Sequence, residues 1–157
     1  MSRMTGPAAG RPLFFKLERW HRRSVYASAA LLLLSGAVWL VLHYFLRPVN
    51  QFGESVNPGE PWAMKVHGAA AMAALFFVGS LLHIHIRPLI RAERNTITGW
   101  AMIVTLSFLT ITGYGLYYMA GESDRSLWSL LHWGVGFSFA VLFILHVIIG
   151  RHGGGKS

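Results

Sequence analysis

The sequence predicts an all-α membrane protein, a four-transmembrane-helix up-and-down bundle with both termini cytoplasmic. Of the 157 residues, 54% are hydrophobic, and the apolar residues gather in four blocks instead of spreading along the chain. Each block is free of Asp, Glu, Lys and Arg over the roughly 20 residues that a spanning helix needs. The charge-free runs are Ser24–Leu46, Val66–Ile86, Asn95–Gly121 and Ser126–Gly150. Only short loops and tails remain, so we expect no catalytic domain besides the bundle.

The distribution of the basic residues predicts the orientation of the helices. A formal charge of +8 could suggest nucleic acid, but the basic residues are sorted by side of the membrane. Arginines and lysines concentrate before the first run, in the second loop and after the last run, whereas the other two loops balance three basic against four acidic residues. Cytoplasmic loops carry the excess of Lys and Arg. We therefore expect lipid contact, no nucleic-acid partner, and loops around Asn50 and Glu122 that face outward.

Three segments follow from this pattern. Residues 1–18 read as a cytoplasmic N-terminal tail, 19–150 as the four-helix transmembrane domain, and 151–157 as a flexible C-terminal tail. A cleaved signal peptide is the competing interpretation of the first apolar run. That run is too long for the apolar core of a signal peptide and no small-residue cleavage site follows it, so we expect a retained helix.

The absence of cysteine restricts the redox chemistry. Iron–sulfur clusters and covalently attached c-type haem both need thiols, and this chain has none. Zinc is disfavoured because the apolar runs offer no cysteine and almost no carboxylate. Any redox centre must be held by histidine or methionine.

Histidines at matched depths are the main functional signal. His132 and His146 lie fourteen residues apart in one apolar run, and His67 lies at the outer level of another. Fourteen residues of α-helix return to within about 40° of the same face, about 21 Å further along. Polar side chains at membrane depth are costly and usually functional. We expect His67 and His132 to form an outer pair and His146 to hold an inner metal centre.

The partner of His146 has three candidates. His83 is about 160° around the helix from His67, and His85 is on the face of His67 but about 27 Å along, deeper than the 21 Å step of the last run. His21 can approach from another side, and its neighbours Arg19, Arg22 and Arg23 could neutralise haem propionates. We favour His21, with His85 or His83 as the alternative.

Two histidines on opposite faces of a porphyrin make a low-spin b-type haem, which carries electrons because no coordination site is open to a substrate. The pattern thus predicts two haem b groups ligated by His21, His67, His132 and His146. A different class of function is a small histidine-lined proton or metal-ion transporter without haem. A structural anchor subunit without cofactor is a third possibility.

The chain resembles the bacterial di-haem b-type cytochromes of the cytochrome b561 and formate dehydrogenase/nickel-iron hydrogenase gamma-subunit kind, over residues 19–150. The resemblance rests on short motifs in each helix: Arg19-Trp20-His21 followed by Ser35-Gly36, His67 with Ala71, Thr112-Gly113, and His132-x3-Gly136 with His146. It implies that the fourth helix ligates both haems, the second helix completes the outer one and the first helix the inner one. Two features depart from the pattern: Arg22-Arg23 follows His21, and the pair His83-x-His85 has no counterpart.

The resemblance further implies an electron-transfer subunit of a membrane-bound oxidoreductase complex in the bacterial inner membrane. Such a subunit passes electrons between the quinone pool and a dehydrogenase, iron–sulfur or cytochrome c partner. His83, His85 and Arg87 are the candidate quinone contacts, because a quinone carbonyl needs a hydrogen-bond donor and its reduction needs protons.

Overall fold

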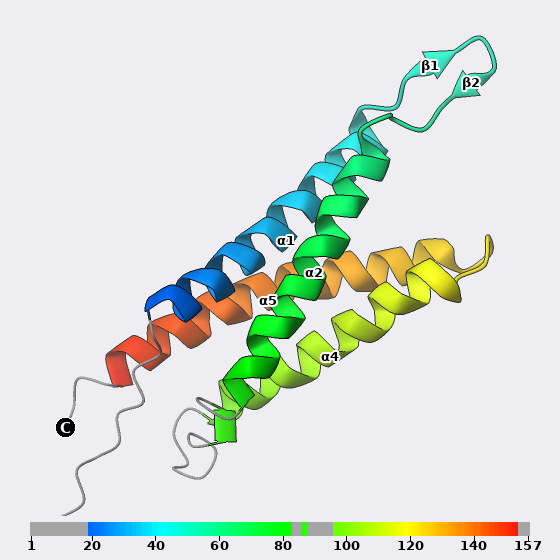
Figure 1. Ribbon diagram of the computed structural model, residues 1–157. Coiled ribbons are helices and arrows are strands. Elements are labelled where there is room, and N and C mark those ends of the chain that lie inside the picture. The colour runs from blue at the N-terminus through cyan, green and yellow to red at the C-terminus, as the bar shows by residue number, and fades with distance from the viewer. Residues whose placement is uncertain (1–18, 83–85, 88–95, 154–157) are drawn as a thin grey trace, which may run out of the picture.

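The protein is a bundle of long apolar helices in this computed structural model, which describes residues 19–82, 86–87 and 96–153. The helices are α1 (Arg19–Phe45), α2 (Glu60–Leu81), α4 (Thr96–Tyr118) and α5 (Arg125–Gly153) (Figure 1). Each of these four is long and apolar enough to cross a membrane. The predicted all-helical membrane fold is confirmed to this extent, and the cytoplasmic position of the termini stays a prediction.

Three of the four helices extend beyond the charge-free runs that predicted them, whereas α4 lies inside its run. α1 begins at Arg19 instead of Ser24, α2 begins at Glu60 instead of Val66, and α5 continues to Gly153, past the expected start of the C-terminal tail. Charge-free runs detect the hydrocarbon layer, whereas helical hydrogen bonding continues into the head groups, where charged ends are tolerated. Glu60 and Pro61 in the first turn of α2 suit a helix start, because the carboxylate faces the positive helix end and proline needs no hydrogen-bond partner there.

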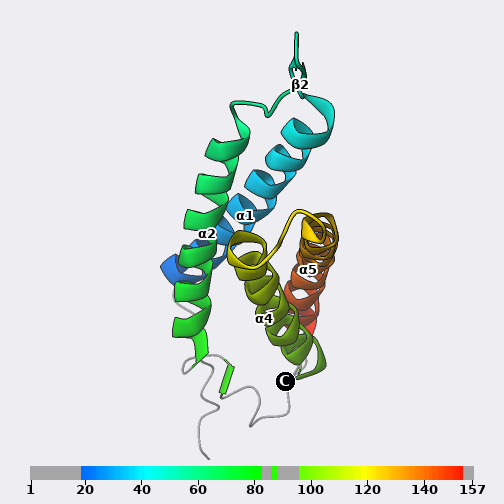
Figure 2. The ribbon, with the colours of Figure 1, turned by 90° about the vertical axis from the view of Figure 1, so that its right-hand side faces the viewer.

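The helices pack as two antiparallel hairpins. α1 lies against α2 and α4 lies against α5, while α1 also touches α5. The start of α1 and the end of α5 lie at the same end of the molecule (Figure 1), and the two pairs lie side by side in the view turned by 90° (Figure 2). The order of the helices is that of an up-and-down bundle.

The burial pattern is that of a protein surrounded by lipid. Large apolar side chains such as Leu34 and Phe76 point outward, whereas the buried apolar residues of the described segments are three alanines of α2: Ala63, Ala70 and Ala74. The buried polar residues are His21, Ser28, Ser35, Glu60 and Thr112. Small side chains allow membrane helices to approach closely, and polar side chains avoid lipid by facing other helices. The interior of the bundle is therefore where its chemistry is concentrated.

A short β-hairpin joins α1 to α2. Strand β1 (Val49–Asn50) pairs antiparallel with β2 (Gly53–Glu54), with Val49 opposite Glu54. Gly53 has a φ of +103°, a left-handed conformation that only glycine adopts without strain. The hairpin projects beyond the ends of α1 and α2 (Figure 1).

The α4–α5 hairpin is closest at Gly115. A Cβ atom at this position would lie 2.8 Å from Cε3 and 2.9 Å from Cη2 of Trp128. The indole is held in place, because its Nε1 donates a hydrogen bond to Asp124 Oδ2 at 3.1 Å. Glycine is thus required at position 115 by the packing of the tryptophan ring.

The replacement Gly115→Ala should lower the stability of the folded protein. The added methyl overlaps the indole of Trp128, and overpacking of this kind costs about 1–3 kcal/mol. Gly134→Ala is the matched control, because a Cβ there meets nothing within 4 Å. Thermal unfolding in detergent would test this, and equal melting temperatures for the two variants would contradict it.

Candidate functional site

His67 and His132 face each other across the two hairpins. His67 comes from α2 and His132 from α5, and their ring centroids are 6.2 Å apart with an angle of 75° between the ring planes. Both side chains are partly buried. The structure thus brings together the two residues that the sequence predicted as the outer pair.

Each of these two imidazoles contacts a hydroxyl of its own hairpin. Ser35 Oγ of α1 lies 3.0 Å from His67 Nδ1, and Thr112 Oγ1 of α4 lies 2.9 Å from His132 Nδ1. Both hydroxyls also donate their single proton to backbone carbonyls of their own helices, Ser35 to Leu31 at 2.6 Å and Thr112 to Phe108 at 2.9 Å. A hydroxyl has one proton to give. The imidazole Nδ1–H must therefore be the donor in both contacts.

This direction of hydrogen bonding sets the tautomer of both histidines. A neutral imidazole with its proton on Nδ1 carries its lone pair on Nε2. Histidine ligands of metals are commonly oriented in this way, with one ring nitrogen donating to an oxygen and the other bonding the metal. His67 and His132 are thus held in the form that can ligate through Nε2.

A glycine beside each hydroxyl makes room for the ring. A Cβ at Gly36 would lie 3.3 Å from Cε1 of His67, and a Cβ at Gly113 would lie 3.3 Å from Cε1 of His132. These distances are tighter than ordinary contacts. The Ser-Gly and Thr-Gly pairs therefore act as units, in which the first residue fixes the ring nitrogen and the second allows the close approach.

His146 has the same kind of partner one level deeper. Thr98 Oγ1 of α4 lies 2.9 Å from His146 Nδ1. Thr98 precedes Thr112 by fourteen residues, as His132 precedes His146, so two antiparallel helices in one register bring both pairs together. A second Thr-Gly pair, Thr98-Gly99, is thus present in the sequence at the spacing of the histidines.

His21 is buried but turned toward α2. Its Nε2 lies 2.8 Å from Ser80 Oγ and 3.3 Å from the Phe77 carbonyl oxygen, and the Ser80 hydroxyl donates to that same carbonyl at 2.7 Å. Nε2–H is therefore the donor, and the lone pair of His21 lies on Nδ1. The neighbouring Arg19, Arg22 and Arg23 are exposed.

α1 and α5 meet where Tyr26 of α1 contacts Phe143 of α5. Tyr26 and Phe143 pack edge to face with ring centroids 5.7 Å apart. In an antiparallel register set by this contact, His21 lies opposite residue 148, so His21 and His146 differ in depth by about 3 Å.

Two of the three candidate quinone contacts fall outside the described residues. These are His83 and His85, which are also the alternative inner ligands. Arg87 is described and is exposed. The predicted group of His83, His85 and Arg87 therefore stays a prediction.

Sequence reasoning missed the hydroxyl partners of all four histidines and the partner of His43, although Ser35 and Thr112 belong to motifs quoted for the family resemblance. Thr98 could have been found from the repeated Thr-Gly pair, whereas Ser80 has no comparable signal because it is followed by Leu81. His43 donates from Nδ1 to Glu60 Oε2 at 2.9 Å. Within the described ranges, no group of three or more His, Cys, Asp or Glu residues could hold a metal ion.

Comparison with known proteins identifies no family: no protein-family model, curated protein or solved structure matches this chain.

Replacement of Thr112 by valine should destabilise the α4–α5 hairpin. Valine has nearly the same shape but cannot accept the Nδ1–H of His132, and a lost interhelical hydrogen bond in a membrane costs about 0.6–1.7 kcal/mol. Thr110→Val is the matched control, because the exposed Thr110 hydroxyl bonds only Leu106 of its own helix. Unfolding in a graded denaturing detergent would compare them, and a loss in Thr110→Val as large as in Thr112→Val would contradict the assignment.

Proposed function

We propose that this chain is a membrane electron-transfer subunit that carries two b-type haems and passes electrons between a partner oxidoreductase and the quinone pool. His67 and His132 would hold the outer haem, and His146 with His21 the inner one.

The separation of His67 and His132 carries the proposal. Histidine nitrogen bonds a first-row metal at about 2.0–2.1 Å, and an imidazole nitrogen lies about 1.1 Å from its ring centre, so two rings on opposite sides of one iron have centroids about 6.3 Å apart. The observed centroid distance is 6.2 Å. Two aromatic rings in plain edge contact can have a similar distance. The Nδ1–H tautomer of both histidines favours ligation over simple packing, because it directs both lone pairs to Nε2.

The residues around this pair suit a resident haem. Ser35 and Thr112 orient the imidazoles, and Gly36 and Gly113 allow the rings to lie against α1 and α4. His67 and His132 would hold such a group, which would supply one-electron transfer without binding a substrate. The chain's own residues hold both histidines in one tautomer.

The similar depths of His21 and His146 support the inner site. Thr98 Oγ1 lies as close to His146 Nδ1 as Thr112 Oγ1 lies to His132 Nδ1, at 2.9 Å in both cases. The packing of Tyr26 on Phe143 places His21 at nearly the depth of His146. Ligation by His21 would require its ring to turn from Ser80 toward α5. The exposed Arg19, Arg22 and Arg23 remain available to propionates.

The alternative function is a small histidine-lined proton or metal-ion transporter without haem. It uses the same buried imidazoles as relay groups and predicts a colourless protein. A reduced-minus-oxidised absorbance spectrum of the purified protein separates the two, since b-type bands with two haems per chain are expected only for the electron-transfer subunit.

Removal of His132 should reduce the haem content from two to one per chain, because the outer haem loses an axial ligand from α5. His146→Ala should have the same effect through the inner haem, and the double variant should contain none. His152→Ala, at the end of the same helix, should keep both. The pyridine haemochrome assay against protein concentration gives the count, and two haems in His132→Ala would refute the outer pair.

The inner ligand is decided by comparing His21→Ala with His85→Ala. We expect one haem in His21→Ala and two in His85→Ala, because only His21 lies on the helix that packs on α5 beside Phe143. Two haems in His21→Ala and one in His85→Ala would identify His85 as the inner ligand. Two haems in both variants would point to His83.

A further inference from the structure

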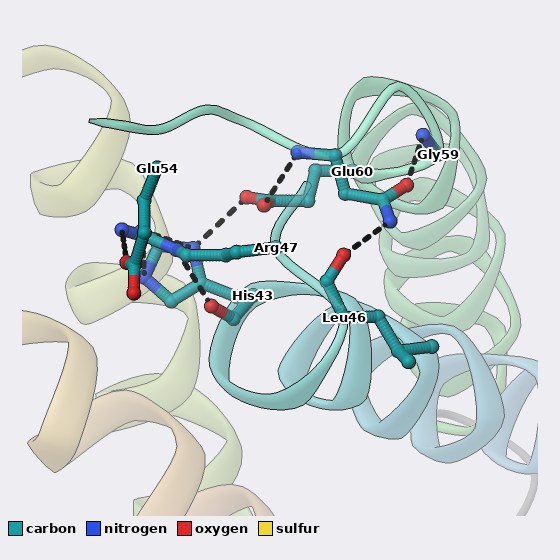
Figure 3. A network of polar contacts seen from close by, with 7 residues as sticks. His43, Leu46, Arg47, Glu54, Gly59 and Glu60 are labelled. Atoms are coloured by element: carbon teal, nitrogen blue, oxygen red, sulfur yellow. Dashed lines mark hydrogen bonds and ion pairs between the residues drawn. The ribbon is translucent and has the colours of Figure 1, made fainter. Parts of the chain in front are cut away.

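A second imidazole site lies at the outer end of the α1–α2 hairpin. His43 of α1 donates from Nδ1 to Glu60 Oε2 at 2.9 Å, and the other carboxylate oxygen, Oε1, accepts the backbone N–H of Asn57 at 3.3 Å (Figure 3). The Glu60 side chain is only 8% exposed, whereas that of His43 is 27% exposed. A buried carboxylate thus faces a histidine that solvent can reach.

The ring of His43 is held on both faces. The indole of Trp39 stacks on it with centroids 4.5 Å apart and planes 14° apart. Arg47 Nη2 lies 3.3 Å from Nδ1 and 3.2 Å from Nε2, and its Nε donates to the His43 carbonyl at 2.8 Å. The near-equal distances to both ring nitrogens place the guanidinium over the ring. A rigid imidazole between an indole and a guanidinium is a defined proton-binding position.

The net charge of this cluster becomes zero when His43 takes up one proton. The charged groups that face His43 come from three elements: Arg47 after α1, Glu54 on β2, which pairs with Arg47 at 3.6 Å, and Glu60 on α2. With neutral His43 the cluster has a net charge of −1, and with protonated His43 it is neutral. Lys65, further along α2, lies over Trp62 instead, with its Nζ 4.5 Å from the ring centroid. One proton on His43 Nε2 therefore changes the cluster between two defined charge states.

The cluster is aligned with the outer histidine pair. Glu60 precedes His67 by seven residues on α2, which places it about 10 Å further out and within about 20° of the same helix face. Charges at this separation interact strongly where little water intervenes. The protonation state of His43 is thus placed to respond to a charge that arrives between His67 and His132.

We infer that the His43–Glu60 pair is the proton-exchange site coupled to the outer redox centre, an inference that rests on the proposed function. When one electron arrives at that centre from the partner, His43 Nε2 takes one proton from the outer aqueous phase, and His43 releases it when the electron leaves. Glu60 stabilises the resulting imidazolium. The pair would thereby link electron passage to proton uptake and release at the outer surface.

The test is a redox titration of the full-length haem-loaded protein at several pH values. In the wild type, the midpoint potential of the outer haem should fall as pH rises, because reduction is favoured by the added proton. His43→Gln should remove this dependence and hold the potential at the wild-type high-pH value. Glu60→Gln removes a negative charge, so it should raise the potential and weaken the dependence.

Asp124→Asn is the matched control, since it removes a carboxylate from the other outer loop, and its potential should vary with pH as in the wild type. A reduced-minus-oxidised infrared spectrum should show histidine ring bands that His43→Gln lacks. Absence of haem from the purified wild-type protein would refute the proposed function. Two bound haems with a flat pH profile, or an unchanged profile in both His43→Gln and Glu60→Gln, would refute the proton-exchange site alone.

Discussion

The structure depends on one constraint: an imidazole inside a bilayer must find a hydrogen-bond partner within the protein. Four histidines meet it with a hydroxyl from the adjacent helix of the same hairpin, at distances of 2.8–3.0 Å. Ser35, Ser80 and Thr112 suit this role because each gives its single proton to a carbonyl one turn back, which leaves the oxygen to accept from the ring. The contacts therefore fix helix register and tautomer together, and the candidate site is a consequence of how the hairpins are joined.

Most of the fold could be predicted because each membrane-spanning helix needs a run of about 20 apolar residues, which is visible in the sequence. The four charge-free runs locate α1, α2, α4 and α5, and the short loop between the last two runs indicates that α4 and α5 are adjacent. The helix ends could not be predicted from the same signal, as Glu60 shows: a charged residue ends an apolar run, but here it begins a helix and pairs with His43. The clash of a Cβ at Gly115 with Trp128 is equally invisible without coordinates, because it depends on the packing angle of two helices.

The candidate site was predictable to the extent that it follows helix periodicity. The meeting of His67 with His132 could be inferred from depth, since both were predicted at the outer level of their apolar runs. The orientation of His21 could not, because the choice between Ser80 and α5 depends on a side-chain rotation that spacing does not determine. The pairing of Thr98 with His146 lies between these cases. The repeated Thr-Gly pair is visible in the sequence, but only the antiparallel register of α4 and α5 shows that Thr98 lies beside His146.

In each hairpin the hydroxyl–imidazole contacts join its own two helices, and this has a consequence for the insertion of the nascent chain into the membrane. The hydroxyl–imidazole contacts lie within α1–α2 or within α4–α5, and none of the four joins one hairpin to the other. A nascent chain can thus shield its costly polar groups as soon as two consecutive helices leave the translocon, before the remaining half has been synthesised. Insertion would then proceed in two self-sufficient stages, and lateral association of the halves would come last.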